Sequence, residues 1–176
     1  MASKSKKNLE QCLPEGQLVN RTWLKAKGFD RPRVDYALRA GKLTAVCHGV
    51  YRRPGPPLKW EHTVYSLNEM GYPVHVGGRS ALELQGRAHY LPMDGRHSIA
   101  LYSHTKIPSW TLYFSGSFRF EIHTKRLFDG FLKTGLMTMP FGAWDWPVPC
   151  SAPERAMIEL LADVQEDGVL DEFNHQ

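Results

Sequence analysis

The sequence has no long apolar run and few cysteines. No stretch approaches the roughly 18 consecutive apolar residues of a membrane-spanning helix, which excludes an integral membrane protein. The basic N-terminal residues 1–7 are not followed by the apolar segment of a secretory signal, so we expect a cytoplasmic protein. The three cysteines, Cys12, Cys47 and Cys150, form no Cys-x-x-Cys pair. We therefore expect small buried apolar side chains rather than a disulfide framework or a cysteine-rich zinc site.

Sequence signatures of catalysis and of metal or cofactor binding are missing as well. The eight histidines show no His-x-x-x-His or His-Glu-x-x-His spacing, so we predict no metal site. There is no Gly-x-Ser-x-Gly motif and no Gly-Lys-Ser/Thr phosphate loop. The pair Gly77 and Gly78 is therefore predicted to form a packing turn before a helix, and a phosphate cradle is the weaker alternative. We expect neither a cofactor nor an enzymatic activity.

One catalytic alternative stays open. Glu121, His123 and Lys125 fall on one face of a predicted strand, as they could in a metal-dependent nuclease. Such a nuclease needs further carboxylates around Mg²⁺, and the sequence offers no clear second one. Alternating charge on an exposed strand explains the same residues.

What the sequence does have is an uneven distribution of charge. The net charge is +4, but residues 1–55 hold 12 Lys and Arg against 4 Asp and Glu, a net of +8, whereas residues 56–176 hold 10 against 14, a net of −4. The change falls at a Pro/Gly cluster, residues 53–57. This division favours a basic nucleic-acid-binding domain over residues 1–55 and a neutral or acidic partner-binding domain over residues 56–176. The helices and strands expected over residues 56–176 make this second domain α+β. Chance clustering of solvated charge is the alternative.

Helical periodicity recurs three times in the basic half. Residues 9–13 predict a short first helix, which residues 14–16 end. Apolar positions over residues 17–27 predict a second helix, which Gly28 closes. Asp30 is a typical N-cap and begins the third helix, with a proline in its first turn and a glycine after its end.

The third helix is amphipathic. Its apolar stripe consists of Val34, Ala37 and Leu38. The remaining surface carries Arg31, Arg33, Tyr36 and Arg39. Guanidinium groups and a tyrosine opposite a buried stripe suit a helix that reads the major groove, so we predict these four residues as DNA contacts. Asp35 lies four residues from both Arg31 and Arg39, and it either orients them through ion pairs or forms with them a solvated salt-bridge lattice.

A short hairpin follows the third helix. Residues 43–47 and 50–53 are rich in β-branched and aromatic residues and flank His48 and Gly49. Three helices followed by a basic hairpin is the order of a winged helix-turn-helix, in which the hairpin contacts the DNA backbone. We therefore predict Arg52 and Arg53 as phosphate contacts. The alternative is a small helical module that binds protein.

The second half alternates helices and strands. Residues 60–70 predict a helix and residues 74–76 a strand, followed by a short helix whose capping box is Ser80 to Glu83. Period-two alternation over residues 98–102, 118–123 and 144–148 predicts a mixed, largely antiparallel sheet. A second capping box, Ser151 to Glu154, begins the last helix. The apolar positions of that helix are Ala156, Met157, Leu160 and Leu161, and the acidic tail beyond them has no clear helical stripe.

Several short motifs occur in a distinctive order. They lie at residues 49–53, 75–86, 88–91, 107–110, 126–128 and 151–156, with a helix from Trp60 after the first. In this order they resemble the AbiEi family, the antitoxins of type IV (AbiE) toxin–antitoxin systems. The similarity extends over nearly the whole chain.

The resemblance implies a winged-helix autorepressor that binds inverted repeats in double-stranded promoter DNA. It also implies a C-terminal antitoxin domain that counteracts a cognate AbiEii-like nucleotidyltransferase toxin, in systems associated with phage defence. Family members continue beyond the last helix, so we expect a shortened antitoxin domain. The other hypothesis is a stand-alone winged-helix regulator whose second domain binds a protein or a small ligand.

Overall fold

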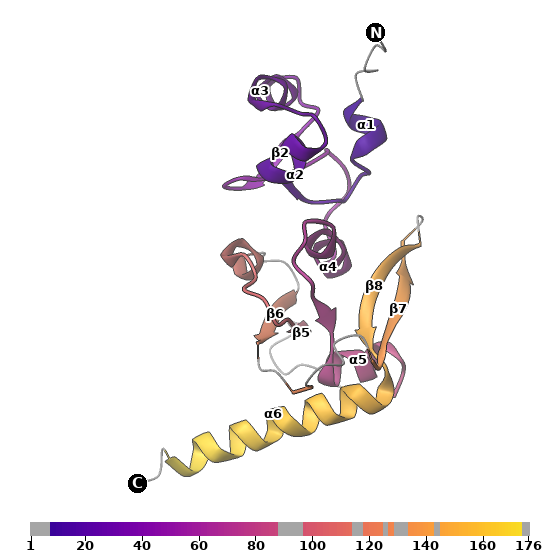
Figure 1. Cartoon of the computed structure of the whole chain (residues 1–176), viewed down its shortest axis with the longest axis vertical. Helices are drawn as coiled ribbons and strands as arrows, with labels where there is room; N and C mark the ends of the chain where they lie inside the picture. The colour runs from indigo at the N-terminus through magenta and orange to yellow at the C-terminus, as the bar shows by residue number, and fades with distance from the viewer. Residues whose placement is uncertain are drawn as a thin grey trace. The chain divides into compact units, whose positions relative to one another are not determined.

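Each half of the chain carries its own sheet (Figure 1). The computed structural model describes residues 8–87, 97–113, 118–124, 127–128, 134–142 and 145–173, without the side chains of Tyr113 and residues 165–173. The chain divides into unit 1, Met1–Gly71, and unit 2, Tyr72–Gln176. Both units combine helices with strands, which confirms the α+β class. The division places residues 56–71 with unit 1, whereas the charge pattern divides the chain at residue 55.

The described part of unit 1, residues 8–71, contains four helices. They are α1 (Leu9–Cys12), α2 (Arg21–Ala26), α3 (Arg31–Arg39) and α4 (Trp60–Glu69). Asp30 caps α3 as predicted, because its Oδ1 accepts a hydrogen bond from the Arg33 backbone N at 3.1 Å. Gly28 follows α2 with φ +90°, a left-handed conformation that favours glycine. The core of the unit includes Leu13, Leu24 and Val34, which hold the first three helices together.

The second helix begins later than predicted. Residues 17–20 were expected to be helical, but Val19–Asn20 forms the short strand β1. The Asn20 side chain accepts a hydrogen bond from the Trp23 backbone N at 2.8 Å, so α2 starts at Arg21. Leu18 N donates to Ser66 Oγ of α4 at 2.8 Å. Leu18 and Val19 are therefore buried, but they lie on an extended segment and not on a helix. Apolar spacing alone does not distinguish these two cases.

The predicted hairpin is present. It consists of β2 (Thr44–Cys47) and β3 (Val50–Arg52), which pair antiparallel. Gly49 lies in the connection with φ +76°. β1 pairs with the other edge of β3, and Val19 lies opposite Tyr51, so the sheet order is β1-β3-β2. The hairpin is thereby joined to the segment that leads into α2.

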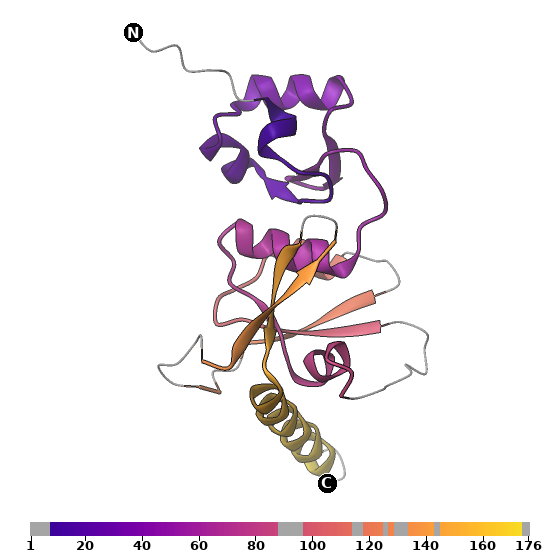
Figure 2. The same ribbon diagram turned by 90° about the vertical axis from the view of Figure 1, so that its right-hand side faces the viewer.

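Unit 2 is built on a five-stranded sheet of order β6-β5-β4-β8-β7 (Figure 2). The strands are β4 (His75–Val76), β5 (His97–Tyr102), β6 (Phe118–His123), β7 (Leu136–Phe141) and β8 (Trp146–Ser151). The helices are α5 (Gly78–Leu84), the 3-10 helix η1 (Ser109–Tyr113) and α6 (Pro153–Phe173). α6 packs beside α5 and also contacts β8. No helix among the described residues is long and apolar enough to cross a membrane.

The sheet is mixed, but the prediction that it is largely antiparallel is wrong. β5 pairs parallel with β6 and β4 pairs parallel with β8, while β4–β5 and β7–β8 are antiparallel. The chain between β5 and β6 includes η1 and returns to begin β6 at the same end as β5. Period-two alternation reports a half-buried strand and not its direction, so this connection could not be predicted.

Both predicted capping boxes are wrong in detail. α5 begins at Gly78, and the Ser80 hydroxyl accepts from Ala100 N at 3.0 Å and donates to the Ser98 carbonyl at 3.3 Å. α6 begins at Pro153, and Ser151 is the last residue of β8. Each serine therefore joins separate elements instead of capping the helix beside it. α6 also continues through the acidic tail to Phe173.

Candidate nucleic-acid interface

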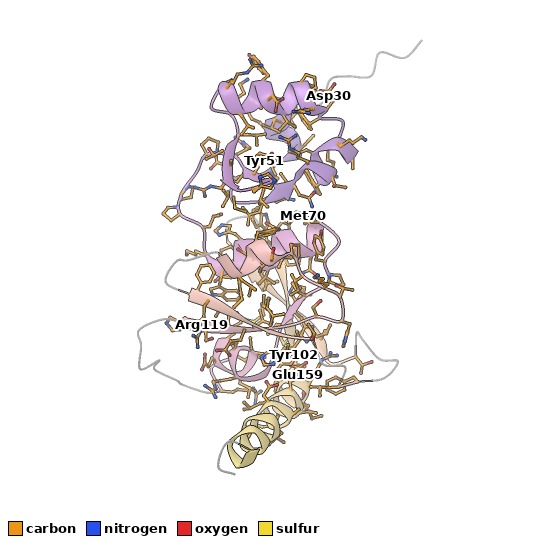
Figure 3. The ribbon with its side chains drawn as sticks, turned by 90° about the vertical axis from the view of Figure 1, so that its left-hand side faces the viewer. Asp30, Tyr51, Met70, Tyr102, Arg119 and Glu159 are labelled. Atoms are coloured by element: carbon orange, nitrogen blue, oxygen red, sulfur yellow. The ribbon has the colours of Figure 1, made fainter. Side chains whose placement is uncertain are left out.

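The exposed face of α3 carries three of the predicted DNA contacts. Arg31, Tyr36 and Arg39 are exposed, and the Tyr36 side chain is 62% accessible. On the opposite side, Val34 and Ala37 are buried in the core of unit 1. Figure 3 labels Asp30 at the start of this helix and shows its side chains as sticks. The helix thus presents two guanidinium groups and a phenol to solvent.

Asp35 lies between arginines of two helices. Its Oδ2 is 3.8 Å from Arg31 Nε, and its Oδ1 is 4.0 Å from Arg21 NH2 of α2. Arg39 does not contact the carboxylate and instead donates from Nε to the Asp35 backbone carbonyl at 3.4 Å. The ion pair expected with Arg31 is therefore present, whereas the one expected with Arg39 is not.

Sequence reasoning missed Arg21 as a member of this cluster. Its Nε donates to the Tyr51 hydroxyl at 2.8 Å, and its guanidinium lies 5.8 Å from the centre of the Tyr51 ring. The hydrogen bond with Tyr51 raises the pKa of Arg21 above its ordinary value, and Asp35 adds to the effect. The available signal was the N-cap Asn20, which places the next residue in the first turn of α2.

Arg33 contacts the turn between α2 and α3. Its NH1 donates to the Gly28 carbonyl at 2.7 Å, and its guanidinium lies 4.5 Å from the centre of the Phe29 ring. These contacts fix the turn that precedes α3. Arg33 therefore differs from Arg31 and Arg39, whose side chains are exposed.

The two hairpin arginines also have partners within unit 1. Arg52 donates to the carbonyl of Pro56 at 2.8 Å and to that of Gly55 at 3.4 Å. Arg53 donates to the Leu13 carbonyl at 3.3 Å and lies 3.7 Å from the Glu15 carboxylate, with its side chain 21% exposed. Arg52 thus holds the Pro/Gly segment, and Arg53 joins the end of the hairpin to the segment after α1.

Unit 2 has a different polar cluster, centred on the buried carboxylate of Glu159. It accepts hydrogen bonds from Gly78 N at 3.0 Å, Ser151 Oγ at 2.8 Å and Arg155 Nε at 2.9 Å. His75 Nε2 lies 3.0 Å from the same carboxylate. Burial alone would raise the pKa of Glu159, but the bonds from His75 and Arg155 outweigh it and lower the pKa. Figure 3 labels Glu159 beside Tyr102.

The Glu159 carboxylate explains the glycine pair. A Cβ on Gly77 would lie 2.3 Å from Glu159 Oε2 and 2.4 Å from Tyr102 Cδ2, so a larger residue would displace one of them. The Gly78 backbone N already has a carboxylate partner. The pair therefore forms the predicted packing turn. The negative group at the start of α5 is the Glu159 carboxylate.

Three aromatic rings form a row across the sheet next to this carboxylate. The Tyr102 ring stacks on His75 at 5.6 Å and on His123 at 4.5 Å between centroids. The Tyr102 hydroxyl donates to Asp163 Oδ2 at 2.5 Å, and His123 Nδ1 lies 3.1 Å from Asp163 Oδ1. Burial and the bond to Asp163 raise the pKa of Tyr102 well above its ordinary value. The row and the two carboxylates attach α6 to the sheet.

The residues of the nuclease alternative have other contacts. Glu121 accepts hydrogen bonds from the Ser98 hydroxyl and from Arg119 NH2, the latter at 3.4 Å. His123 pairs with Asp163, and Lys125 lies outside the described residues. Within the described part of the chain, no group of three or more His, Cys, Asp or Glu side chains is arranged to hold a metal ion.

Comparison with known proteins gives one result for the basic half. Residues 1–93 match the family model described as "Transcriptional regulator, AbiEi antitoxin N-terminal domain". The matched segment includes all of unit 1, together with β4 and α5 of unit 2. A search of curated proteins gives no match.

Proposed function

The chain belongs to the AbiEi antitoxin family of transcriptional regulators, and from this membership we propose that unit 1 is a winged helix-turn-helix domain that binds double-stranded promoter DNA. In this proposal α2 and α3 form the helix-turn-helix, α3 enters the major groove, and the β2–β3 hairpin is the wing. The protein then represses the operon that encodes it by binding inverted repeats in the promoter.

The observation that carries this proposal is the exposed face of α3. Arg31, Tyr36 and Arg39 share that face, and the helix is held against the core by its opposite stripe. Guanidinium groups can donate to guanine edges or phosphates, and a phenol can do the same or pack on a thymine methyl. The net charge of +8 over residues 1–55 supports the same partner.

Arg52 and Arg53 have a second role in this proposal. Their contacts with backbone carbonyls fix the end of the hairpin, so it stays ordered before DNA binds. We propose that they contact phosphate through the N–H groups that remain. Arg33 supports α3 from the turn and adds positive charge near the start of that helix.

The second proposed activity is that of an antitoxin. Family membership supports an antitoxin or regulatory role for the chain. We propose that it counteracts a nucleotidyltransferase-like toxin encoded beside it, and that the protein itself is not an enzyme. Co-expression of the neighbouring reading frame tests this: growth arrest by that protein should be relieved by the full chain.

DNA binding is tested by titrating the DNA upstream of the gene with the full chain at several salt concentrations. We expect the affinity to fall steeply with salt, by close to one logarithmic unit per logarithmic unit of salt for each phosphate contact. Arg39→Ala should weaken specific binding by about 1–3 kcal/mol if Arg39 contacts a base.

Arg119→Ala is the matched control, because Arg119 is an exposed arginine of unit 2 with a side chain 62% accessible. It should bind DNA as the unaltered chain does. Binding that does not respond to salt, or equal behaviour of the two variants, would count against the assignment of α3.

A further inference from the structure

The last helix has its apolar side chains on the outside. Over residues 153–164, whose side chains the structure describes, α6 exposes four large apolar residues: Met157 (48%), Ile158 (51%), Leu161 (56%) and Val164 (58%). At 100° per residue they lie within about 120° of one another around the helix, and they form a single stripe. Helical spacing grouped Met157 and Leu161 with Ala156, but Ala156 is buried whereas Met157 and Leu161 are exposed.

The inner face of α6 is polar instead. Arg155 and Glu159 are 5% and 1% exposed, and Asp163 binds Tyr102 and His123 on the sheet. The side that packs on unit 2 is therefore held by hydrogen bonds and charge pairs. Because α6 packs on the sheet through this polar face, the apolar stripe stays exposed. A contiguous stripe of this kind is typical of a surface that binds a partner.

The charge of the helix limits what can cover the stripe. Residues 153–173 contain seven Asp and Glu and a single Arg. Arg155 and Glu159 are buried against each other and offset one another, so the other six acidic residues give this segment a net charge of −6. Two copies of α6 packed on each other would bring like charges together, and an anionic lipid surface would repel the helix for the same reason. A partner with basic groups around an apolar seam complements both properties.

We propose that the stripe formed by Met157, Ile158, Leu161 and Val164 is a docking surface for a basic amphipathic helix of another protein. The partner helix places its apolar residues along the stripe, as in helix-in-groove recognition. Its lysines and arginines complement the net negative charge of residues 153–173. This surface belongs to unit 2, whereas α3 belongs to unit 1.

The test uses the full chain and two synthetic helical peptides with the same leucine pattern, one with lysine and arginine at its polar positions and the other with glutamate. Isothermal titration calorimetry should detect binding of the basic peptide only, weakening as salt is raised. Leu161→Ser should reduce the affinity at least about tenfold. Leu112→Ser is the matched control and should retain it, since Leu112 is 59% exposed on η1.

Three results would overturn the proposal. The first is equal binding of both peptides or of neither. The second is an equal effect of Leu161→Ser and Leu112→Ser. The third is self-association of the chain, measured by sedimentation velocity, that Leu161→Ser abolishes, because the occupant of the stripe would then be a second copy.

Discussion

The Glu159 carboxylate accepts a hydrogen bond from the backbone N of Gly78, 3.0 Å away and 81 residues earlier in the chain. This bond places a negative charge at the start of α5, where the helix N–H groups have no partners of their own. The same carboxylate binds Ser151 at the end of β8 and Arg155 on α6. One buried side chain therefore connects α5 and α6 with the sheet of unit 2.

We predict that Glu159→Gln lowers the free energy of unfolding by about 3 kcal/mol. The variant keeps the shape of the side chain but leaves the buried Arg155 without its carboxylate, and loss of one partner of a buried pair is costly. Chemical denaturation followed by fluorescence measures the change. Glu154→Gln, at an exposed position of the same helix, should stay within about 0.5 kcal/mol of the unaltered chain. Similar effects of the two variants would contradict the role given to Glu159.

The stability should also depend on pH through Glu159. Its pKa in the folded chain is lowered, so its contribution is present above the pKa of an unfolded glutamate, about 4.3, and is lost as pH falls through the lower folded value. The difference in unfolding free energy between the unaltered chain and Glu159→Gln should therefore shrink as pH falls below about 4. A difference that stays constant across this range would argue against a charged Glu159.

Asp35→Asn should strengthen binding to DNA of any sequence. The Asp35 carboxylate lies close to Arg31 and Arg21, and it places negative charge on the face proposed to meet phosphate. Removing it should raise the affinity for a random duplex several-fold, with little change in stability because these ion pairs are exposed. Fluorescence anisotropy measures the affinity. Glu10→Gln, at an exposed position on α1, is the control, and an equal effect there would indicate a general charge effect.

The three cysteines are free thiols and should react at different rates. Burial raises the pKa of Cys150 to about 11, so about 0.1% of it is thiolate at pH 8. Cys12 and Cys47 are half-buried. Mass spectrometry after brief treatment with a thiol reagent should show labelling of Cys12 before Cys150. Cys150 should react readily only in denaturant, and equal rates in the folded chain would contradict its burial.

The parts of the fold that local sequence predicts are those fixed by neighbouring residues. Asp30 caps α3 through a residue three positions away, and Gly49 allows the turn of the hairpin. The exposed face of α3 follows from the same local periodicity. These features need no information from distant segments.

The parts that were mispredicted depend on distant partners. Residues 17–20 are extended because they pair with β3 and hydrogen-bond to α4. Ser80 and Ser151 form hydrogen bonds with other elements, namely β5 and α6. The inner face of α6 is polar because Tyr102, His75 and Arg155 hold its carboxylates, so hydrophobic periodicity gave the wrong orientation. Arg21 joined the candidate site through Tyr51, 30 residues away, and through Asp35 on α3.

The position of β4 at the centre of the second sheet has a consequence for fragments of this protein. A fragment ending at residue 93, where the family match ends, would contain β4 and α5 but lack β5, β8 and Glu159. Both edges of β4 would then be open to pairing with other chains, and such edges promote aggregation. A fragment ending at Gly71 avoids this strand altogether and is the better choice for isolating the unit that we propose binds DNA.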